Sequence, residues 1–463
     1  MPLHAPRTLY TADWVLPMSG APIEYGAVLV EGDRIVWVGR AVDFPTDAPV
    51  HADASLRTEA LGCAALMPGL VNAHSHLELT VMRGFLEGLE FGSWLRTLTV
   101  VRRDLLSEQD LLDSARLGIV EGLRHGITTY ADCTDSTLPI AAMRELGVRG
   151  IGYVEVFGPD PAQCRDSLAG LQARVTACRA EDTELVTTGV SPHAPYTVSA
   201  PLFRATADYA RAEQLPMAVH VAESAAETAF VCDAEGPFAE RLRARGIAVA
   251  AQARSPIALL EEAGVLAAHP LLVHVIRADE DDFARIADHG ATIVHCPISN
   301  AKLGQGIASL DRMLAHGIAV GLGSDSVASN DRMHLLDEAR QATLFHAIRS
   351  GIPDSLTAHD ALCLATRGGA ASLGLLGTTG TLEPGKAADL AAFPLGGADA
   401  QPVHDPAVAL VHALAGRARA VLVAVAGRVL VRNGVVLCDD PLWHERIGVT
   451  GARLREWRRR GHS

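Results

Sequence analysis

The chain has 463 residues, 49% of them hydrophobic and 20% charged, so it can bury more than one large core and is not a disordered protein. Forty basic and 54 acidic side chains give a formal net charge of −14 at pH 7. A field of that sign repels phosphate backbones and anionic lipid, so we expect neither a nucleic acid nor a membrane as a partner. The basic run from Arg453 to Arg460 is typical of the solvated face of a terminal helix.

The sequence also indicates a compartment. The N-terminal segment has no basic stretch followed by an apolar run, so no secretion signal is expected. No run of about 18 apolar residues predicts a membrane span. The eight cysteines are scattered, without a C-x-x-C pair or a disulfide framework. This pattern is typical of reduced thiols, and we expect a cytoplasmic protein.

The two ends of the chain have the same β-rich texture. Residues 1–66 contain short strand-like runs, with Glu31-Gly32-Asp33 as a hairpin turn. In residues 378–463 the pairs Ala426-Gly427 and Asn433-Gly434 are hairpin signals. We expect a small β-sandwich built from both ends, with a tail at the C-terminus.

The middle of the chain, residues 67–377, alternates strand-like and helical stretches. The strand-like runs are GLVNAH, GITTYADC, GIGYVEVF, LVTTGVSPH, PMAVHVAE, PLLVHVI, ATIVHCP and AVGLGSD. Helix start and stop signals lie between them, for example at Ser107–Gly126, Asp279–Gly290 and Ser309–Gly317. Eight apolar strands alternating with helices predict an α/β fold, a (β/α)₈ TIM-like barrel. An open doubly wound sheet is the alternative, but no G-x-G-x-x-G follows the first strand.

Catalytic groups in such barrels lie where strands end, so polar residues at these ends are the candidates. They are His74, His76, His193, His220, Glu223, His274 and Asp325. On an extended chain, the side chains of His74 and His76 point the same way and can reach one metal ion. Two hydrogen-bonded strand histidines would give the same pattern, because 19 histidines produce on the order of one H-x-H pair by chance.

Carboxylates accompany these histidines at two strand ends. Glu223 follows His220 by three residues, at the end of an apolar strand. Burying a carboxyl group there costs free energy unless the group has a partner or a functional role. Asp325 follows the last strand, where turn and cap residues are also common. Because a barrel closes between its first and last strands, we expect Asp325 beside the H-x-H pair. Three imidazoles and one carboxylate suit catalytic zinc, with ferrous iron as the alternative.

Five stretches together resemble the amidohydrolase superfamily, in particular its chlorohydrolase and deaminase (ATZ/TRZ-like) branch. They are MPGLVNAHSHLELT, SPHAPYTVS, HVAES, HCPISNAKLGQG and GLGSDSVASN. The resemblance covers nearly the whole chain, since this family also has a two-ended β-sandwich beside its barrel. It implies one divalent ion per chain, most simply Zn²⁺, with the ligands His74, His76, His220 and Asp325. Binuclear relatives carry a carboxylated lysine on the fourth strand, where this chain has Ser191-Pro192-His193.

The resemblance also implies roles for the neighbouring residues. His274 would hold the attacking water and Asp325 would take its proton. Glu223 would move a proton to a ring nitrogen, and His193 would orient the substrate. The chemistry is consistent, because a divalent cation lowers the pKa of water towards about 7 and a carboxylic acid in a dry pocket can protonate a ring nitrogen.

Several residues bear on the substrate. In relatives that deaminate adenosine-type thioethers, a tryptophan packs on the substrate, and Trp94 lies at the matching distance from His76, although a core aromatic would fit equally. Those relatives also have a glutamate for the ribose hydroxyls, where this chain has Arg102 and Arg103. Guanidinium groups there suit a substrate carboxylate, or form an exposed pair at a helix start. A last pair, Ser299 and Asn300, either touches the substrate or fixes the seventh loop.

Our leading hypothesis is a deaminase of 6-aminodeoxyfutalosine, because the pattern resembles the aminofutalosine deaminases of the alternative menaquinone pathway. A deaminase of S-adenosylhomocysteine or 5′-methylthioadenosine is second, and a chlorohydrolase-type enzyme acting on another N-heterocycle is third. A catalytically silent barrel that binds a partner is a different class, but such relatives typically lose metal ligands. A serine hydrolase is disfavoured because no G-x-S-x-G occurs.

The family resemblance suggests a homodimer. Residues 227–254 are longer than a simple βα loop requires, and form either a pocket wall or an ordinary surface insertion.

Overall fold

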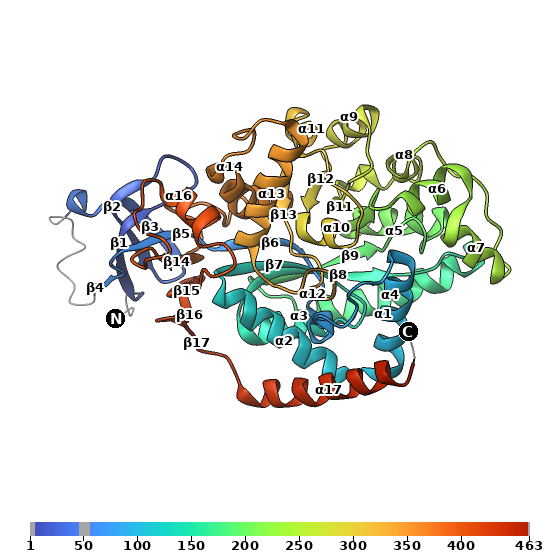
Figure 1. Ribbon diagram of the computed structural model, residues 1–463, viewed down its shortest axis with the longest axis horizontal. Coiled ribbons are helices and arrows are strands. Elements are labelled where there is room, and N and C mark those ends of the chain that lie inside the picture. The colour runs from blue at the N-terminus through green and yellow to red at the C-terminus, as the bar shows by residue number, and fades with distance from the viewer. Residues whose placement is uncertain (1–4, 46–55, 462–463) are drawn as a thin grey trace. The chain divides into compact units, whose positions relative to one another are not determined.

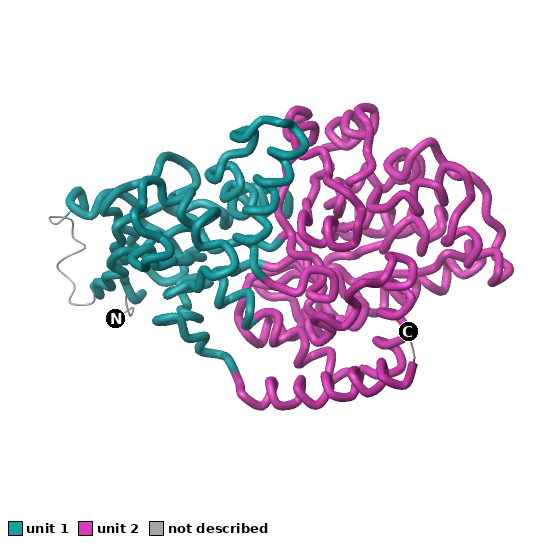
Figure 2. The backbone as a smooth tube through the Cα atoms, in the orientation of Figure 1, with its two compact units in different colours: residues 1–72, 120–129, 334–439 teal, residues 73–119, 130–333, 440–463 magenta. Residues whose placement is uncertain are grey.

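A computed structural model describes residues 5–45 and 56–461 of the chain (Figure 1). The expectation that the N-terminal segment carries no secretion signal includes residues 1–4, which lie outside the described residues. The chain divides into two compact units (Figure 2). Unit 1 comprises residues 1–72, 120–129 and 334–439, and unit 2 comprises residues 73–119, 130–333 and 440–463. These units group residues by contacts, and the domain boundaries expected near residues 66 and 377 stay a prediction.

Unit 1 contains a nine-stranded mixed sheet to which both ends of the chain contribute. The order is β17-β16-β15-β14-β5-β1-β2-β3, and β4 pairs with β1. The strands are β1 (Arg7–Val15), β2 (Ile23–Glu31), β3 (Arg34–Arg40), β4 (Leu56–Ala60), β5 (Ala64–Pro68), β14 (Leu390–Pro394), β15 (Leu422–Val425), β16 (Arg428–Arg432) and β17 (Val435–Val436). The two ends meet where β5 and β14 pair antiparallel, with Met67 opposite Ala391. A buried cluster that includes Tyr10, Ile35 and Leu390 forms the core of this unit.

The three predicted hairpin turns are confirmed. Gly32 has a φ of 59° between β2 and β3. Ala426 and Gly427 have φ values of 46° and 74° between β15 and β16, and Asn433 and Gly434 have φ values of 51° and 77° before β17. Left-handed backbone at both central residues matches the twist of the flanking strands, which is why Asn-Gly pairs favour such turns. The helical elements described in this unit are η1 (Ala41–Asp43), α13 (Leu335–Ser350), α14 (Ala358–Cys363), η6 (Leu364–Gly368), α15 (Gly369–Ser372), α16 (Pro406–Val408) and η7 (Ala409–Ala413).

All eight expected middle strands are present, which confirms the (β/α)₈ fold class. They are β6 (Leu70–Ser75), β7 (Ile127–Thr134), β8 (Arg149–Val156), β9 (Val186–Pro192), β10 (Ala218–Val221), β11 (Leu271–His274), β12 (Thr292–His295) and β13 (Val320–Leu322). Ladder pairing is not continuous around them. It forms two four-stranded parallel sheets, β6-β7-β8-β9 and β10-β11-β12-β13. The halves meet through single parallel bridges, Val190 with Met217 and Ser75 with Asp325. The second bridge places the ends of the first and last strands together, as expected.

Helices follow these strands and begin where predicted, after Ser107, Asp279 and Ser309, although the Ser309 side chain makes no capping hydrogen bond. The helical elements of unit 2 are η3 (Leu77–Met82), α1 (Phe91–Leu105), α2 (Glu108–Arg124, which continues into unit 1), α3 (Leu138–Leu146), η4 (Pro161–Gln163), α4 (Cys164–Arg179), α5 (Ala200–Glu213), α6 (Ala225–Asp233), α7 (Gly236–Ala244), α8 (Pro256–Glu262), η5 (Leu266–Ala268), α9 (Glu280–Asp288), α10 (Pro297–Lys302), α11 (Leu310–Ala315), α12 (Val327–Asn330) and α17 (Pro441–Arg459). Before α2, the Ser107 backbone N–H donates to Asp110 at 2.8 Å and the Asp110 N–H donates back to the Ser107 hydroxyl at 3.2 Å. A capping box formed by Asp279 and Asp282 begins α9.

The basic run near the C-terminus lies on α17. Its residue Arg453 pairs with Asp110 at 2.6 Å, while Leu454 is buried against other apolar side chains. The helix is therefore anchored to unit 2 and is only partly a solvated face. Within the described residues, no helix is both long enough and apolar enough to cross a membrane.

Candidate metal centre and active site

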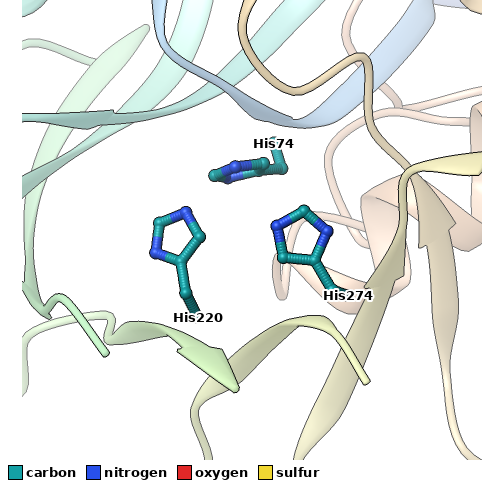
Figure 3. A group of neighbouring side chains, drawn as sticks. All are labelled: His74, His220 and His274. Atoms are coloured by element: carbon teal, nitrogen blue, oxygen red, sulfur yellow. The ribbon is translucent and has the colours of Figure 1, made fainter. Parts of the chain in front are cut away.

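Three imidazoles meet at the carboxyl ends of separate strands. Figure 3 shows the rings of His74, His220 and His274 facing one another, and all three side chains are buried. His74 lies on β6, His220 on β10 and His274 at the end of β11. Each strand is short and apolar, so its polar end residue is the one held at the mouth of the barrel.

The spacing of four donor atoms fits a metal ion. The Nε2 atoms of His76 and His220 are 3.3 Å apart, and His74 Nε2 is 3.3 Å from Asp325 Oδ1. That oxygen is 3.7 Å from His76 Nε2. Nitrogen and oxygen ligands of a tetrahedral zinc ion, each about 2.0–2.1 Å from it, lie about 3.3 Å from one another. His74, His76 and Asp325 form one group with the spacing that a metal requires, and His74, His220 and His274 form another, so the four-residue ligand set stays a prediction.

The protonation states of these groups also suit metal binding. Burial lowers the pKa of His74 to about 4, and burial likewise lowers the pKa of His76 and of His220. Burial opposes the ionisation of Asp325, but the neighbouring imidazoles outweigh it and hold the pKa of that carboxyl well below its usual range. At neutral pH the site therefore presents neutral imidazoles and an ionised carboxylate, the forms that bind divalent cations.

Hydrogen bonds fix which ring nitrogen His220 and His274 present to the site. His220 Nδ1 lies 3.3 Å from the backbone oxygen of His193, to which it donates, and this leaves Nε2 as the free ligand atom. His274 Nδ1 donates to Asn300 Oδ1 at 2.9 Å. The His274 Nε2 atom then lies 3.7 Å from Glu223 Oε1. Partners of this kind orient metal ligands and their neighbours.

The backbone at the site is strained. His274, Asp325 and Ala222 have φ values of 75°, 56° and 53°, a left-handed region that non-glycine residues rarely adopt. Such strain costs about 1–3 kcal/mol for each residue and gathers at functional sites. Space is also tight, because a Cβ on Gly323 would lie 2.9 Å from His74 Cβ. A glycine is required where β13 passes the first ligand.

Ser299 and Asn300 on α10 are buried beside this centre, and neither lines the cavity described below. The Ser299 hydroxyl donates to Asp325 Oδ2, which also accepts from Ser329 at 3.2 Å. Asn300 holds His274, as described above. Both residues thus hold groups of the site, Ser299 through Asp325 and Asn300 through His274, and a contact of either with the substrate stays a prediction.

Glu223 is a buried carboxyl group close to the histidines. Burial, followed by the negative charge of Asp325, raises the pKa of Glu223 to about 8. The backbone around it is fixed by Glu227 on α6, whose carboxylate accepts from the N–H groups of Ala222 and Glu223 at 2.8 and 2.9 Å. Glu223 is therefore protonated at neutral pH and can donate a proton from a fixed position.

A cavity of about 640 Å³ opens in front of these groups. Aromatic residues form much of its wall, including Trp94, which lies nearly parallel to Phe91 at a centroid distance of 6.4 Å. His193 also lines the cavity, and its Nδ1 is 2.8 Å from the Thr197 hydroxyl. Trp94 and His193 thus lie where a substrate could contact them.

The two arginines after the first strand differ in environment, although both line the cavity. Arg102 forms ion pairs with Glu78 at 3.0 Å and Asp135 at 2.7 Å, so two carboxylates already compensate its charge. Arg103 is exposed and pairs with its neighbour Asp104 at 2.6 Å. Arg102 therefore stabilises the buried Glu78, and Arg103 is the more available of the two guanidinium groups.

Some cavity residues were missed by the sequence analysis. Glu155, at the end of β8, is buried, and its Oε1 has no hydrogen-bond partner among the described residues. The strand-end rule that found His220 also points to Glu155, so this signal was available. Tyr196 had no such signal, and α7 was covered only by the expectation that residues 227–254 form a pocket wall or a surface insertion.

A barrel with this cluster at its strand ends defines the class of metal-dependent hydrolases. The chain belongs to the amidohydrolase family, whose model matches residues 65–430, and it is a hydrolase that acts on C–N bonds.

Three comparisons add detail about relatives. The chain is 30% identical over 427 residues to the 5-methylthioadenosine/S-adenosylhomocysteine deaminase of Moorella thermoacetica, which covers 92% of this chain and 94% of that protein. An adenosine deaminase from Xanthomonas campestris with bound zinc has a TM-score of 0.86 and 27% identity, and covers 98% and 100% of the two chains. The zinc complex of atrazine chlorohydrolase from Arthrobacter aurescens has a TM-score of 0.80 and 27% identity, and covers 96% and 99%.

Proposed function

We propose that this protein is a metal-dependent hydrolytic deaminase of adenine-type nucleosides. The observation that carries the proposal is the meeting of two elements at one cavity. A four-ligand cluster of His74, His76, His220 and Asp325 lies beside Glu223, a carboxyl group held in its protonated form. Relatives named as deaminases of adenosine and of adenosine thioethers support the same chemistry.

The ligand set fits one divalent cation, and zinc is our first choice over iron because the similar adenosine deaminase carries zinc. When bound, such an ion supplies Lewis acidity and lowers the pKa of water to about 7. The protein's own groups then direct that water. His274 Nε2 holds it by a hydrogen bond, since Nδ1 is committed to Asn300, and Asp325 accepts its proton.

Proton delivery to the substrate falls to Glu223. Attack at the ring carbon that bears the amine requires a proton on the adjacent ring nitrogen, and a buried carboxylic acid supplies it. The resulting tetrahedral carbon expels ammonia after the amine receives the proton that Asp325 took from water. As the carbonyl of the product forms, its hydroxyl proton returns to Glu223, which is thereby restored. His193 and Trp94 position the ring, the first by a hydrogen bond and the second by packing on its face.

For the particular substrate we propose 6-aminodeoxyfutalosine, which would place the enzyme in menaquinone synthesis. The replacement of a ribose-binding glutamate by Arg102 and Arg103 supports this choice, and Arg103 is the arginine with the more available charge. S-adenosylhomocysteine or 5′-methylthioadenosine is the second choice, favoured by the names of the relatives. A chlorotriazine-type heterocycle is the third, suggested by the atrazine chlorohydrolase fold.

Ammonia release from metal-replete enzyme tests these choices directly. The panel is 6-aminodeoxyfutalosine, S-adenosylhomocysteine, methylthioadenosine, adenosine, guanine and a chlorotriazine, with chloride release measured for the last. Glu223→Gln should lower ammonia release about 10²- to 10⁴-fold, and Glu262→Gln, at an exposed position, should leave it unchanged. A protein that binds metal but releases neither ammonia nor chloride would support the silent-barrel alternative.

We also propose a cytoplasmic homodimer that takes a small-molecule substrate. Sedimentation of the purified protein tests the dimer, and fractionation of cells tests the compartment.

A further inference from the structure

One helix of the insertion in residues 227–254 presents a single face to the cavity. This helix, α7 (Gly236–Ala244), lies beside α6 in unit 2 (Figure 1). Four residues of the helix and its C-terminal end line the cavity: Phe238, Arg241, Leu242 and Arg245. Their spacing of i, i+3, i+4 and i+7 is that of one helical face. The insertion is therefore a wall of the cavity.

A continuous row of rings leads from the metal centre to this wall. The His193 ring lies 4.9 Å from that of His220 and 5.9 Å from that of Tyr196, by centroids. Tyr196 in turn stacks on Phe238 at 4.0 Å with an interplanar angle of 5°. A substrate whose amine lies at the histidines would thus extend along an aromatic wall and end at α7.

The α7 wall ends in positive charge that the protein does not compensate. Arg241 and Arg245 are exposed, and within the described part of the chain neither guanidinium has an ion pair or a hydrogen bond. The acids of the cavity lie elsewhere. Glu78 and Asp135 are paired with Arg102, and the remaining carboxyls are buried beside the histidines.

We infer that Arg241 and Arg245 bind an anionic group of the substrate, a task for which Arg102 and Arg103 are less suited because acidic neighbours already pair with them. The substrate that fits is an adenine nucleoside with an apolar or aromatic 5′ substituent ending in a carboxylate. This inference rests on the proposed function. The 5′ substituent lies on the side of the nucleoside opposite the amino group, so a substrate with its amine at the histidines and its ring nitrogen at Glu223 directs this substituent towards the exposed end of the cavity. Its apolar part contacts Phe238 and Leu242, and two guanidinium groups recognise the carboxylate.

The test compares two adenine nucleosides that differ only in charge: 5′-S-(4-carboxyphenyl)-5′-thioadenosine and its carboxamide. The zinc-loaded wild-type enzyme should deaminate the carboxylate with a kcat/KM about 10- to 100-fold higher. The double variant Arg241→Gln/Arg245→Gln should lose this preference and keep its kcat/KM for the carboxamide. The preference should also shrink at high salt, because exposed charges are screened.

A control lies on the same helix. Arg243 does not line the cavity and donates to the backbone oxygen of Ala234 at 2.7 Å. Arg243→Gln removes one positive charge from α7 and should keep the preference intact. A preference that falls equally in this variant would overturn the inference, since it would show only a general effect of charge.

Calorimetry separates the inference from the proposed function. The carboxylated inosine product should bind wild-type enzyme about 10- to 100-fold more tightly than it binds the double variant, whether or not turnover occurs. Equal kcat/KM values for the two nucleosides overturn the inference and leave the deaminase intact. If neither nucleoside releases ammonia, the proposed function is overturned. Product binding that depends on Arg241 and Arg245 would still support the α7 site in that case.

Discussion

The hydrogen bond between Asn300 and His274 gives a sharp test of how the site is oriented. Asn300 does not line the cavity, and its side-chain oxygen accepts from His274 Nδ1 at 2.9 Å. In Asn300→Ala the Nδ1–H group stays buried and loses this acceptor. A buried donor left without its partner costs about 1–3 kcal/mol, which is about 5- to 150-fold in kcat/KM if the cost falls on the transition state.

The assay is ammonia release, measured together with metal content and the urea midpoint. Metal content should stay at the wild-type level, because the four proposed ligands are not touched by Asn300. Asn433→Gly is the matched control, since it removes an exposed amide at a turn residue with a φ of 51° and should change nothing. A folded, metal-loaded Asn300→Ala enzyme with wild-type kcat/KM would refute the idea that this bond orients His274 for the reaction.

Four further outcomes are expected. Chelation should abolish ammonia release and lower Tm, and added zinc should restore both, because a ligand bound only by the folded state stabilises it. Since burial raises the pKa of Glu223 to about 8, the acid is protonated below that value and kcat/KM should fall as the pH rises through it. Glu223→Gln should lower kcat/KM about 10²- to 10⁴-fold and remove this fall at high pH from the pH profile. Gly323→Ala should release metal on dialysis and destabilise the fold by about 1–3 kcal/mol, because the new Cβ would lie 2.9 Å from His74 Cβ. Arg102→Met should lower the free energy of unfolding by about 3 kcal/mol, since it leaves Glu78 buried without its cation. A urea titration that shows no change would refute a stabilising role for this ion pair.

Most of the fold could be predicted from the sequence because its signals are local. Apolar runs broken by capping residues such as Asp279 mark the strands and helices, and Asn433-Gly434 marks a hairpin. The grouping of His74 and Asp325 was also predictable, since barrel closure brings the first and last strands together whatever the loops do.

The rest of the site depends on contacts between separate loops, which leave no local pattern. Arg102 is paired with Asp135, which lies 33 residues further along the chain, so an arginine expected to meet the substrate is already compensated. Arg241 and Arg245 look like ordinary surface residues in the sequence. Their importance arises only because the insertion turns one helical face inward, a matter of loop geometry that composition does not encode.

The bond between Glu227 and the backbone of Glu223 has a consequence for engineering. Glu227 begins the insertion, and it also holds the residue that we propose as the proton donor. Selectivity and chemistry are therefore not separate modules in this barrel. If the insertion is exchanged for that of a relative, Glu227 is exchanged with it. The chimera is therefore expected to have a changed pH profile of catalysis as well as a changed substrate preference. An exchange that begins after Asp233 keeps Glu227 and should change the substrate preference alone.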